Sequence, residues 1–350
     1  MTVQKKLLDP QIPYPNNVSL YFHIPFCKKK CSYCDFVSYA GKEDLIDEYV
    51  DALIREFELL RSTFNFQLST IYFGGGTPTL LKTSHFENII NTLICHLSLD
   101  ICHSEISIEA NPGTVSFEYL RELRILGINR ISIGVQSFND KHLKTLGRIH
   151  NSAEAIKAVE DARKAGFENI SIDLIFAIPN QTLEEWKGDL QIALSLSPEH
   201  LSTYNLQIEE GTPLFERMTN NKIQRTNEDL DADMYEFTID WLTANGFRHY
   251  EVSNFTKPGL ECKHNINYWK MGSWIGIGTG AKSHIGKTNT SDAIFMGLRL
   301  IDGINKSLFK GFEKEVQDLC SQGLIEEFGQ NIKLTRKGLL LGNLVFEKFV

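Results

Sequence analysis

The stretch NRISIGV (residues 129–135) holds the pattern that decides the fold. It is short and alternates β-branched residues with small ones, which is typical of a buried strand. Its Ile-Ser-Ile triplet recurs at 106–108 and 170–172. Successive side chains of a strand point to opposite faces, so each triplet presents serine on one face and isoleucine on the other. We therefore predict three equivalent strands.

Similar runs recur along the first half of the chain, and helical stretches such as SAEAIKAVEDARKAG (152–166) lie between them. Strands that alternate with helices predict parallel strands with helical crossovers. Six such units predict an α/β fold, a partial (β/α)6 barrel of the TIM type, with a doubly wound open sheet as the alternative. The predicted strands span residues 18–24, 69–75, 104–110, 129–135, 169–175 and 200–206.

The second half is less regular. Residues 259–289 are rich in Gly, Asn, Trp and His and predict loop and turn, whereas 324–338 predict a β-hairpin after helical stretches. We expect a small C-terminal α+β domain of winged-helix character. The predicted domains are a barrel at 1–215, a linker region at 216–290 and the C-terminal domain at 291–350.

The serine faces of the three equivalent strands predict a shared site. Continued toward the carboxyl end of its strand, each face reaches one polar residue, which is Glu109, Gln136 or Asp173. Ligands of β/α barrels bind at this rim. A single carboxylate at a strand end more often caps a loop or a helix, but three polar groups in the same phase favour a common pocket.

Composition narrows the class of protein. The chain has 350 residues and a formal net charge of -8, which argues against a broad nucleic-acid or anionic-membrane surface. The amino end lacks the apolar core of a signal peptide, and no run approaches the roughly 20 apolar residues of a transmembrane segment. The seven cysteines therefore favour reduced thiols or metal ligands, and we expect a cytoplasmic protein.

Three of the cysteines are crowded into CKKKCSYC (27–34). Structural zinc sites usually have four ligands, often as two separated pairs, and that spacing is absent here. An iron–sulfur cluster normally takes four thiolates, so Cys27, Cys31 and Cys34 would leave one iron of a [4Fe–4S] cube free. An open position on a metal indicates chemistry or ligand binding. The cluster is the favoured interpretation, and zinc is the alternative.

The pattern Y-x-H-I-P-F-C-x3-C-x2-C resembles the cluster motif of the radical S-adenosylmethionine (SAM) enzymes, and FGGGTPT (73–79) resembles their glycine motif. The resemblance implies a partial β/α barrel with a [4Fe–4S] cluster on Cys27, Cys31 and Cys34. In this family the free iron binds the amino and carboxylate groups of SAM, and one electron from the cluster cleaves SAM to a 5'-deoxyadenosyl radical.

The resemblance also implies which residues bind the cofactor. Tyr21, the backbone around Tyr33, Gly75 and Glu109 match positions that bind SAM beside the cluster, with Glu109 paired to its ammonium group. The positions that hold a second SAM in the oxygen-independent coproporphyrinogen III oxidases of this family match Gly76, Thr77, Gln136, Arg148, Asp173 and Gln207.

Two departures favour the haem-chaperone branch of the family over the oxidase branch. The oxidases carry a fourth cysteine where this chain has Phe36, and their segment before the cluster is longer. The stretch CKHNINYW (262–269) also resembles a signature of the chaperones.

That signature supplies candidate haem contacts. His264 could offer imidazole to the iron, with Cys262 as a thiolate alternative, while Tyr268 and Trp269 offer flat apolar surface to the macrocycle. A lone histidine beside aromatic residues is more often a hydrogen-bonded packing residue, so ligation by His264 is a hypothesis.

The resemblance thus implies a protein that binds haem as cargo and delivers it to acceptor haemoproteins, with a [4Fe–4S] cluster and SAM in the barrel. The alternatives are a coproporphyrinogen III oxidase of porphyrin metabolism and a radical enzyme with another substrate. The acidic balance disfavours nucleic acid as that substrate. We predict no catalytic residue, and both enzymatic activity and assembly into a homodimer stay open.

Overall fold

The computed structural model describes residues 17–63, 67–97, 104–220, 222–286 and 288–349; Cys102 and the first 16 residues lie outside this part. Its centre is a nine-stranded sheet in which β10 and β9 run antiparallel at one edge and the other strands run parallel. From edge to edge the strands are β11 (Trp274–Ile277), β1 (Asn17–Ile24), β4 (Gln67–Gly75), β5 (Glu105–Ala110), β6 (Arg130–Gln136), β7 (Ile170–Phe176), β8 (His200–Asn205), β10 (Asn254–Thr256) and β9 (Arg248–Glu251).

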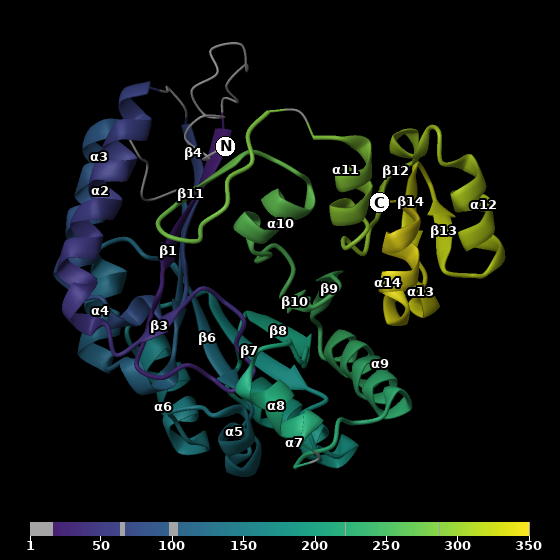
Figure 1. The fold of residues 1–350 in the computed structure, drawn as a ribbon, viewed down its shortest axis with the longest axis horizontal. Coiled ribbons are helices and arrows are strands. Elements are labelled where there is room, and N and C mark those ends of the chain that lie inside the picture. The colour runs from purple at the N-terminus through teal and green to yellow at the C-terminus, as the bar shows by residue number, and fades with distance from the viewer. Residues whose placement is uncertain (1–16, 64–66, 98–103, 221, 287, 350) are drawn as a thin grey trace.

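This sheet confirms the predicted partial barrel. The six predicted strands correspond to β1, β4, β5, β6, β7 and β8, which lie side by side in chain order. A doubly wound sheet would instead reverse its strand order at an inner strand, so that alternative is wrong. Figure 1 shows the curved sheet with helices along its outer side.

Those helices connect successive strands and cover the outer face of the sheet. Two of them begin at capping boxes, in which Asn151 and Thr182 accept hydrogen bonds from the backbone N–H groups of Glu154 and Glu185. Their apolar sides pack with the isoleucine faces of the strands into one core. The helices are α2 (Ile46–Thr63), α3 (Thr83–Leu97), α4 (Phe117–Ile125), α5 (Asp140–Leu146), α6 (Ser152–Lys164) and α7 (Leu183–Ser195).

The stretch 259–289 differs from the predicted loop. It contains helix α10 (Lys263–Trp269) and strand β11, which extends the sheet beyond β1 and places Trp274 opposite Ser19. A strand of four residues carries too little periodicity to be recognised locally. Its partner, from the opposite end of the chain, makes it a strand.

After α8 (Pro213–Thr219) and α9 (Glu228–Ala244), a small α+β unit with its own apolar core follows, at the right of Figure 1. The predicted hairpin is present as β13 (Ile325–Phe328) and β14 (Asn331–Leu334), to which β12 (Ile304–Asn305) adds a third strand. Its helices are α11 (Thr290–Gly297), α12 (Glu313–Ser321), α13 (Arg336–Leu340) and α14 (Gly342–Phe346). Within the described ranges, none of the helices has the length and hydropathy that crossing a membrane requires.

Candidate functional site

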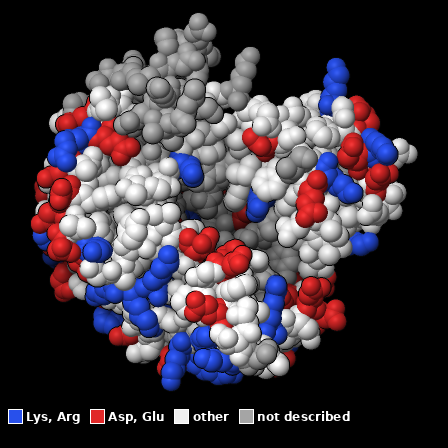
Figure 2. Space-filling view, in the orientation of Figure 1, with Lys and Arg blue, Asp and Glu red and all other residues white. Residues whose placement is uncertain are grey.

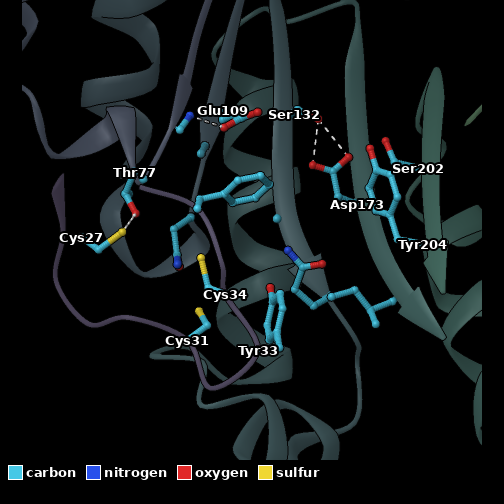
Figure 3. Close-up of a pocket in the computed structure, with 18 of the residues that line it drawn as sticks. Cys27, Cys31, Tyr33, Cys34, Thr77, Glu109, Ser132, Asp173, Ser202 and Tyr204 are labelled. Carbon is cyan, nitrogen blue, oxygen red and sulfur yellow. Dashed lines mark hydrogen bonds between the residues drawn. The ribbon is translucent and has the colours of Figure 1, made fainter. Parts of the chain in front are cut away.

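A cavity of about 490 Å³ opens at the carboxyl ends of the parallel strands. The cysteine loop forms one side of it, and the ends of β4 to β8 form most of the rest. Figure 3 shows Cys27, Cys31 and Cys34 on the loop side, and Glu109 and Asp173 on the strand side.

Contacts with distant segments fix the path of the cysteine loop. Its first cysteine belongs to β2 (Phe26–Cys27), which pairs with β3 (Tyr39–Ala40). The N–H of Ser32 donates to the carbonyl of Leu146 (2.9 Å), and the carbonyl of Ser32 accepts from the N–H of Leu214 (2.8 Å). Gly147 lies against Ser32 with a φ of 75°, where a Cβ would stand 2.5 Å from the serine hydroxyl. A residue with a side chain would be strained at this φ and would clash with the serine hydroxyl, so the position requires glycine.

The three thiols have surroundings that suit metal-bound thiolates. Cys27 is buried and Cys31 and Cys34 are half-buried, and all three are free of disulfides. The hydroxyl of Thr77 donates to Cys27 Sγ (3.5 Å), and Arg148 Nη1 donates to Cys31 Sγ (3.2 Å). Hydrogen bonds to the sulfurs are one means by which proteins tune iron–sulfur clusters, so these donors fit a cluster.

A zinc ion fits less well. Among the residues described, no three His, Cys, Asp or Glu side chains are grouped as the ligands of one ion. Zinc ligands must all reach a single centre at about 2.0–2.3 Å. The thiolates of a four-iron cube bind different irons and stand farther apart, which suits three cysteines spread along one loop.

Glu109 joins the ends of β4 and β5. Its Oε1 accepts from the hydroxyl of Tyr72 and its Oε2 from the N–H of Gly75, both at 3.0 Å. Gly75 has a φ of 113°, and a Cβ there would stand 2.6 Å from the ring of His23, so the position requires glycine. Burial raises the pKa of Glu109 to about 7, and the two hydrogen bonds oppose that rise. A cationic ligand beside Glu109 would favour the charged carboxylate.

The end of β6 departs from regular strand geometry. Gln136 has a φ of 71°, which is uncommon for a residue with a side chain, and the pairing with β7 shifts register between Gly134 and Gln136. The carbonyl of Gly134 accepts from Arg148 Nη2 (2.5 Å). The bulge turns Gln136 into the cavity and leaves a carbonyl for Arg148, as bulges beside sites often do.

Asp173, at the same level on β7, is also held by its neighbours. The hydroxyl of Ser132 lies 2.9 Å from each of its oxygens, and that of Ser171 donates to Oδ1 (3.1 Å). Burial raises its pKa, and these hydrogen bonds oppose the rise. The serine faces predicted from the sequence therefore do more than lead to Asp173, because they supply its hydrogen-bond donors.

The structure brings most of the residues implied by the resemblance to this one cavity. Tyr21 is the exception: its hydroxyl hydrogen-bonds with Nδ1 of His23 (3.0 Å), and it does not line the cavity. The residues that do line it are Tyr33, Gly75, Gly76, Thr77, Glu109, Gln136, Arg148, Asp173 and Gln207.

The suggested haem contacts lie elsewhere. His264 is 1% exposed, and its Nδ1 and Nε2 hydrogen-bond with the hydroxyls of Thr70 (2.7 Å) and Tyr268 (2.9 Å). Its ring stacks on Tyr72, and burial lowers its pKa to about 3. The expectation that His264 ligates haem is therefore not supported, because both ring nitrogens already serve the packing of α10 against the barrel.

Trp269 and Tyr268 are likewise used in packing. The guanidinium of Arg299 lies 5.1 Å from the ring centroid of Trp269, and Tyr268 makes an edge contact with Trp274. Neither lines the cavity. Cys262, the thiolate alternative, is fully buried and donates to Glu105 (Sγ to Oε1, 3.7 Å).

The lining also includes residues that were not singled out from the sequence, among them Tyr72, Arg130, Ser202, Tyr204 and Asn265. Arg130 is notable because it starts β6 on the face that carries Ser132, which is an unusual place for a charge. Tyr204 and the loop residue Phe36 are 42% and 67% exposed, so the cavity has aromatic side chains at its mouth.

The surface beside the cysteine loop is locally basic although the chain is acidic. Lys28, Lys29 and Lys30 are all exposed, and Lys28 and Lys30 make hydrogen bonds only to backbone carbonyls among the described residues. In Figure 2, Lys and Arg side chains gather at the lower left, where the loop runs in Figure 1. This charge favours the approach of anionic ligands or partners.

The chain is similar to known proteins in sequence and in fold. Residues 21–193 match the family model of the radical SAM superfamily, and 288–341 match that of the HemN C-terminal domain. The chain is 38% identical to the haem chaperone HemW of Lactococcus lactis (95% of this chain, 97% of that protein) and 41% identical to that of Escherichia coli (77% and 70%). Its fold is similar to that of the E. coli coproporphyrinogen III oxidase HemN, with a TM-score of 0.83 and 24% identity over 100% and 93% of the two chains.

Proposed function

The chain belongs to the HemW family of radical SAM proteins, and from that membership we propose that it binds haem and delivers it to acceptor haemoproteins. The observation that carries the proposal is the similarity to haem chaperones along nearly the whole chain, together with a cavity that combines three thiols with exposed aromatic side chains. Phe36 and Tyr204 offer the flat apolar surface that a macrocycle needs, and the basic loop favours its propionates.

We propose further that Cys27, Cys31 and Cys34 hold a [4Fe–4S] cluster and that Gly75 and Glu109 bind SAM beside it. When bound, the cluster supplies an electron and an iron with an open coordination position. Thr77 and Arg148 then donate to the sulfurs. The free thiols of the described cysteines fit a reducing compartment such as the cytoplasm.

Fewer observations support the alternative function, a coproporphyrinogen III oxidase. The likeness to the E. coli oxidase is at 24% identity, which supports the fold alone. Phe36 replaces the fourth cysteine of the oxidase motif, and its side chain points to solvent at the cavity mouth rather than into the core.

Anaerobic reconstitution with iron and sulfide, followed by two parallel assays, tests the proposal. We expect saturable haem binding, transfer of the bound haem to an apo-haemoprotein, and no oxidation of coproporphyrinogen III. Decarboxylation of coproporphyrinogen at an enzymatic rate would establish the oxidase instead, and absence of saturable haem binding would remove the chaperone function.

A further inference from the structure

Arg130 is a buried cation with unused hydrogen-bond donors. It is 2% exposed, its Nε is buried without a partner, and the hydrogen bonds and ion pairs among the described residues do not include its guanidinium. A guanidinium carries five N–H donors, and a buried charge without partners is costly. A second buried polar group without a partner lies on the neighbouring strand. It is the hydroxyl of Ser107, the residue that pairs with Arg130 across β5 and β6.

The carboxyl groups near Arg130 do not use its donors. Glu105 accepts from the backbone N–H groups of Lys263 and His264, so it serves the first turn of α10. Glu109 accepts from Tyr72 and Gly75, and Asp173 accepts from serine hydroxyls. These acids balance the charge of Arg130 from a distance, but its N–H groups stay available.

The free donors face the cavity. Arg130 lines it together with Tyr72 of β4, Ser132 of β6, Ser202 of β8 and Asn265 of α10. A planar fork of N–H groups in a buried wall matches the two oxygens of a carboxylate. Burial of the site would make such a pairing stronger than at the surface.

From this arrangement we infer that Arg130 anchors a carboxylate of the bound ligand at the inner end of the cavity. The inference rests on the proposed function, because it names the group by which the cargo is recognised in the same cavity. Two ligands could supply a carboxylate, which are the propionate of a porphyrin and the methionine carboxylate of SAM.

A porphyrin whose propionates are esterified cannot supply a carboxylate. Its binding therefore distinguishes the propionate of haem from the carboxylate of SAM without any mutation. Reconstituted wild-type protein is titrated with haem and with haem dimethyl ester, and its affinity for SAM is measured by calorimetry. The same titrations are made with Arg130→Gln, with Arg130→Lys, which keeps the charge, and with Arg55→Gln as the matched control. Arg55 is exposed on α2, away from the cavity. Circular dichroism and thermal melting establish which variants are folded.

We expect the wild type and Arg55→Gln to bind haem roughly tenfold more tightly than the ester, and Arg130→Gln to bind both equally. If the wild type binds haem and ester equally while Arg130→Gln loses roughly tenfold in SAM affinity, the anchor holds and SAM supplies the carboxylate.

The inference is overturned if folded Arg130→Gln binds haem, ester and SAM as Arg55→Gln does; saturable haem binding by the wild type would then leave the proposed function standing. If Arg130→Gln does not fold, equal affinity of the wild type for haem and ester, with unchanged SAM affinity in Arg130→Lys, overturns it as well. If the wild type binds no haem, the proposed function fails, and the SAM titrations alone decide for or against the anchor.

Discussion

The backbone N–H of Gly75 donates a 3.0 Å hydrogen bond to Oε2 of Glu109, and so connects the glycine motif with the end of the next strand. Two segments that resemble SAM-binding positions in the sequence are thus one structural unit. Because Glu109 is buried, its pKa lies near 7, and its charge depends on what lies beside it.

SAM affinity should therefore depend on pH. A carboxyl with a raised pKa is mostly neutral below about pH 7 and charged above it, and the ammonium group of SAM prefers the charged form. We expect affinity to rise between about pH 6 and pH 8. In Glu109→Gln the rise should vanish, and binding at the upper pH should weaken by about 1.5–3 kcal/mol.

Calorimetry on the reconstituted protein measures both effects. Glu118→Gln, an exposed change on α4, is the matched control and should behave as wild type. Equal affinities of Glu109→Gln and wild type at the upper pH would exclude Glu109 as a SAM ligand.

Single Cys→Ala variants should show which cysteines the cluster requires and which are dispensable for it. Cys27, Cys31 and Cys34 lie together beside the cavity, so loss of any one should leave the cluster incomplete. Cys95 and Cys320 are exposed on α3 and α12 and should be dispensable. Iron and sulfide are quantified after anaerobic reconstitution. A full complement of iron in Cys31→Ala, or stoichiometric zinc in the wild type, would contradict the assignment.

Replacement of His264 should affect stability and not the haem spectrum. In His264→Ala the hydroxyls of Thr70 and Tyr268 lose their partner in the core, which should cost about 1–3 kcal/mol of unfolding free energy. The imidazole is buried and engaged through both nitrogens, so the Soret band of the haem complex should keep its position. Urea unfolding and absorbance titration measure the two quantities, and a shifted Soret band in folded His264→Ala would restore this residue as a ligand.

The buried carboxyl of Glu251 should make the fold less stable at high pH than at low pH. It is 2% exposed, and burial raises its pKa to about 7, above its value in the unfolded chain. The folded state therefore binds the proton more tightly, and the free energy of unfolding falls as pH rises from about 4.5 to about 7. Glu251→Gln keeps an acceptor for the N–H of Ser253 and removes the charge.

We expect this variant to exceed the wild type by up to about 2–3 kcal/mol at pH 8 and to match it at pH 5, as measured by urea unfolding. Glu210→Gln, an exposed change, should match the wild type at both values. A Glu251→Gln protein less stable than wild type at pH 8 would show that the carboxylate is charged and paired in the fold.

Elements with a local sequence signal were predicted correctly. The Ile-Ser-Ile strands, the helix that ends before Gly166 and the C-terminal hairpin were predicted because alternation and turn residues lie within a few positions of one another. The rim residues Glu109 and Asp173 followed from strand phase, since parallel strands bring their carboxyl ends to one edge, whereas Gln136 lines the cavity at a bulge.

Features that depend on distant partners emerge from the folded arrangement of the chain. Strand β11 forms because it pairs with β1, and His264 is a packing residue because Thr70 and Tyr268 take its ring nitrogens. Arg130 carries no motif, yet the fold buries it beside the cavity, and no described residue accepts a hydrogen bond from its Nε. Burial and hydrogen bonding depend on which segments surround a side chain, and the residues adjacent to it in the sequence do not specify those segments.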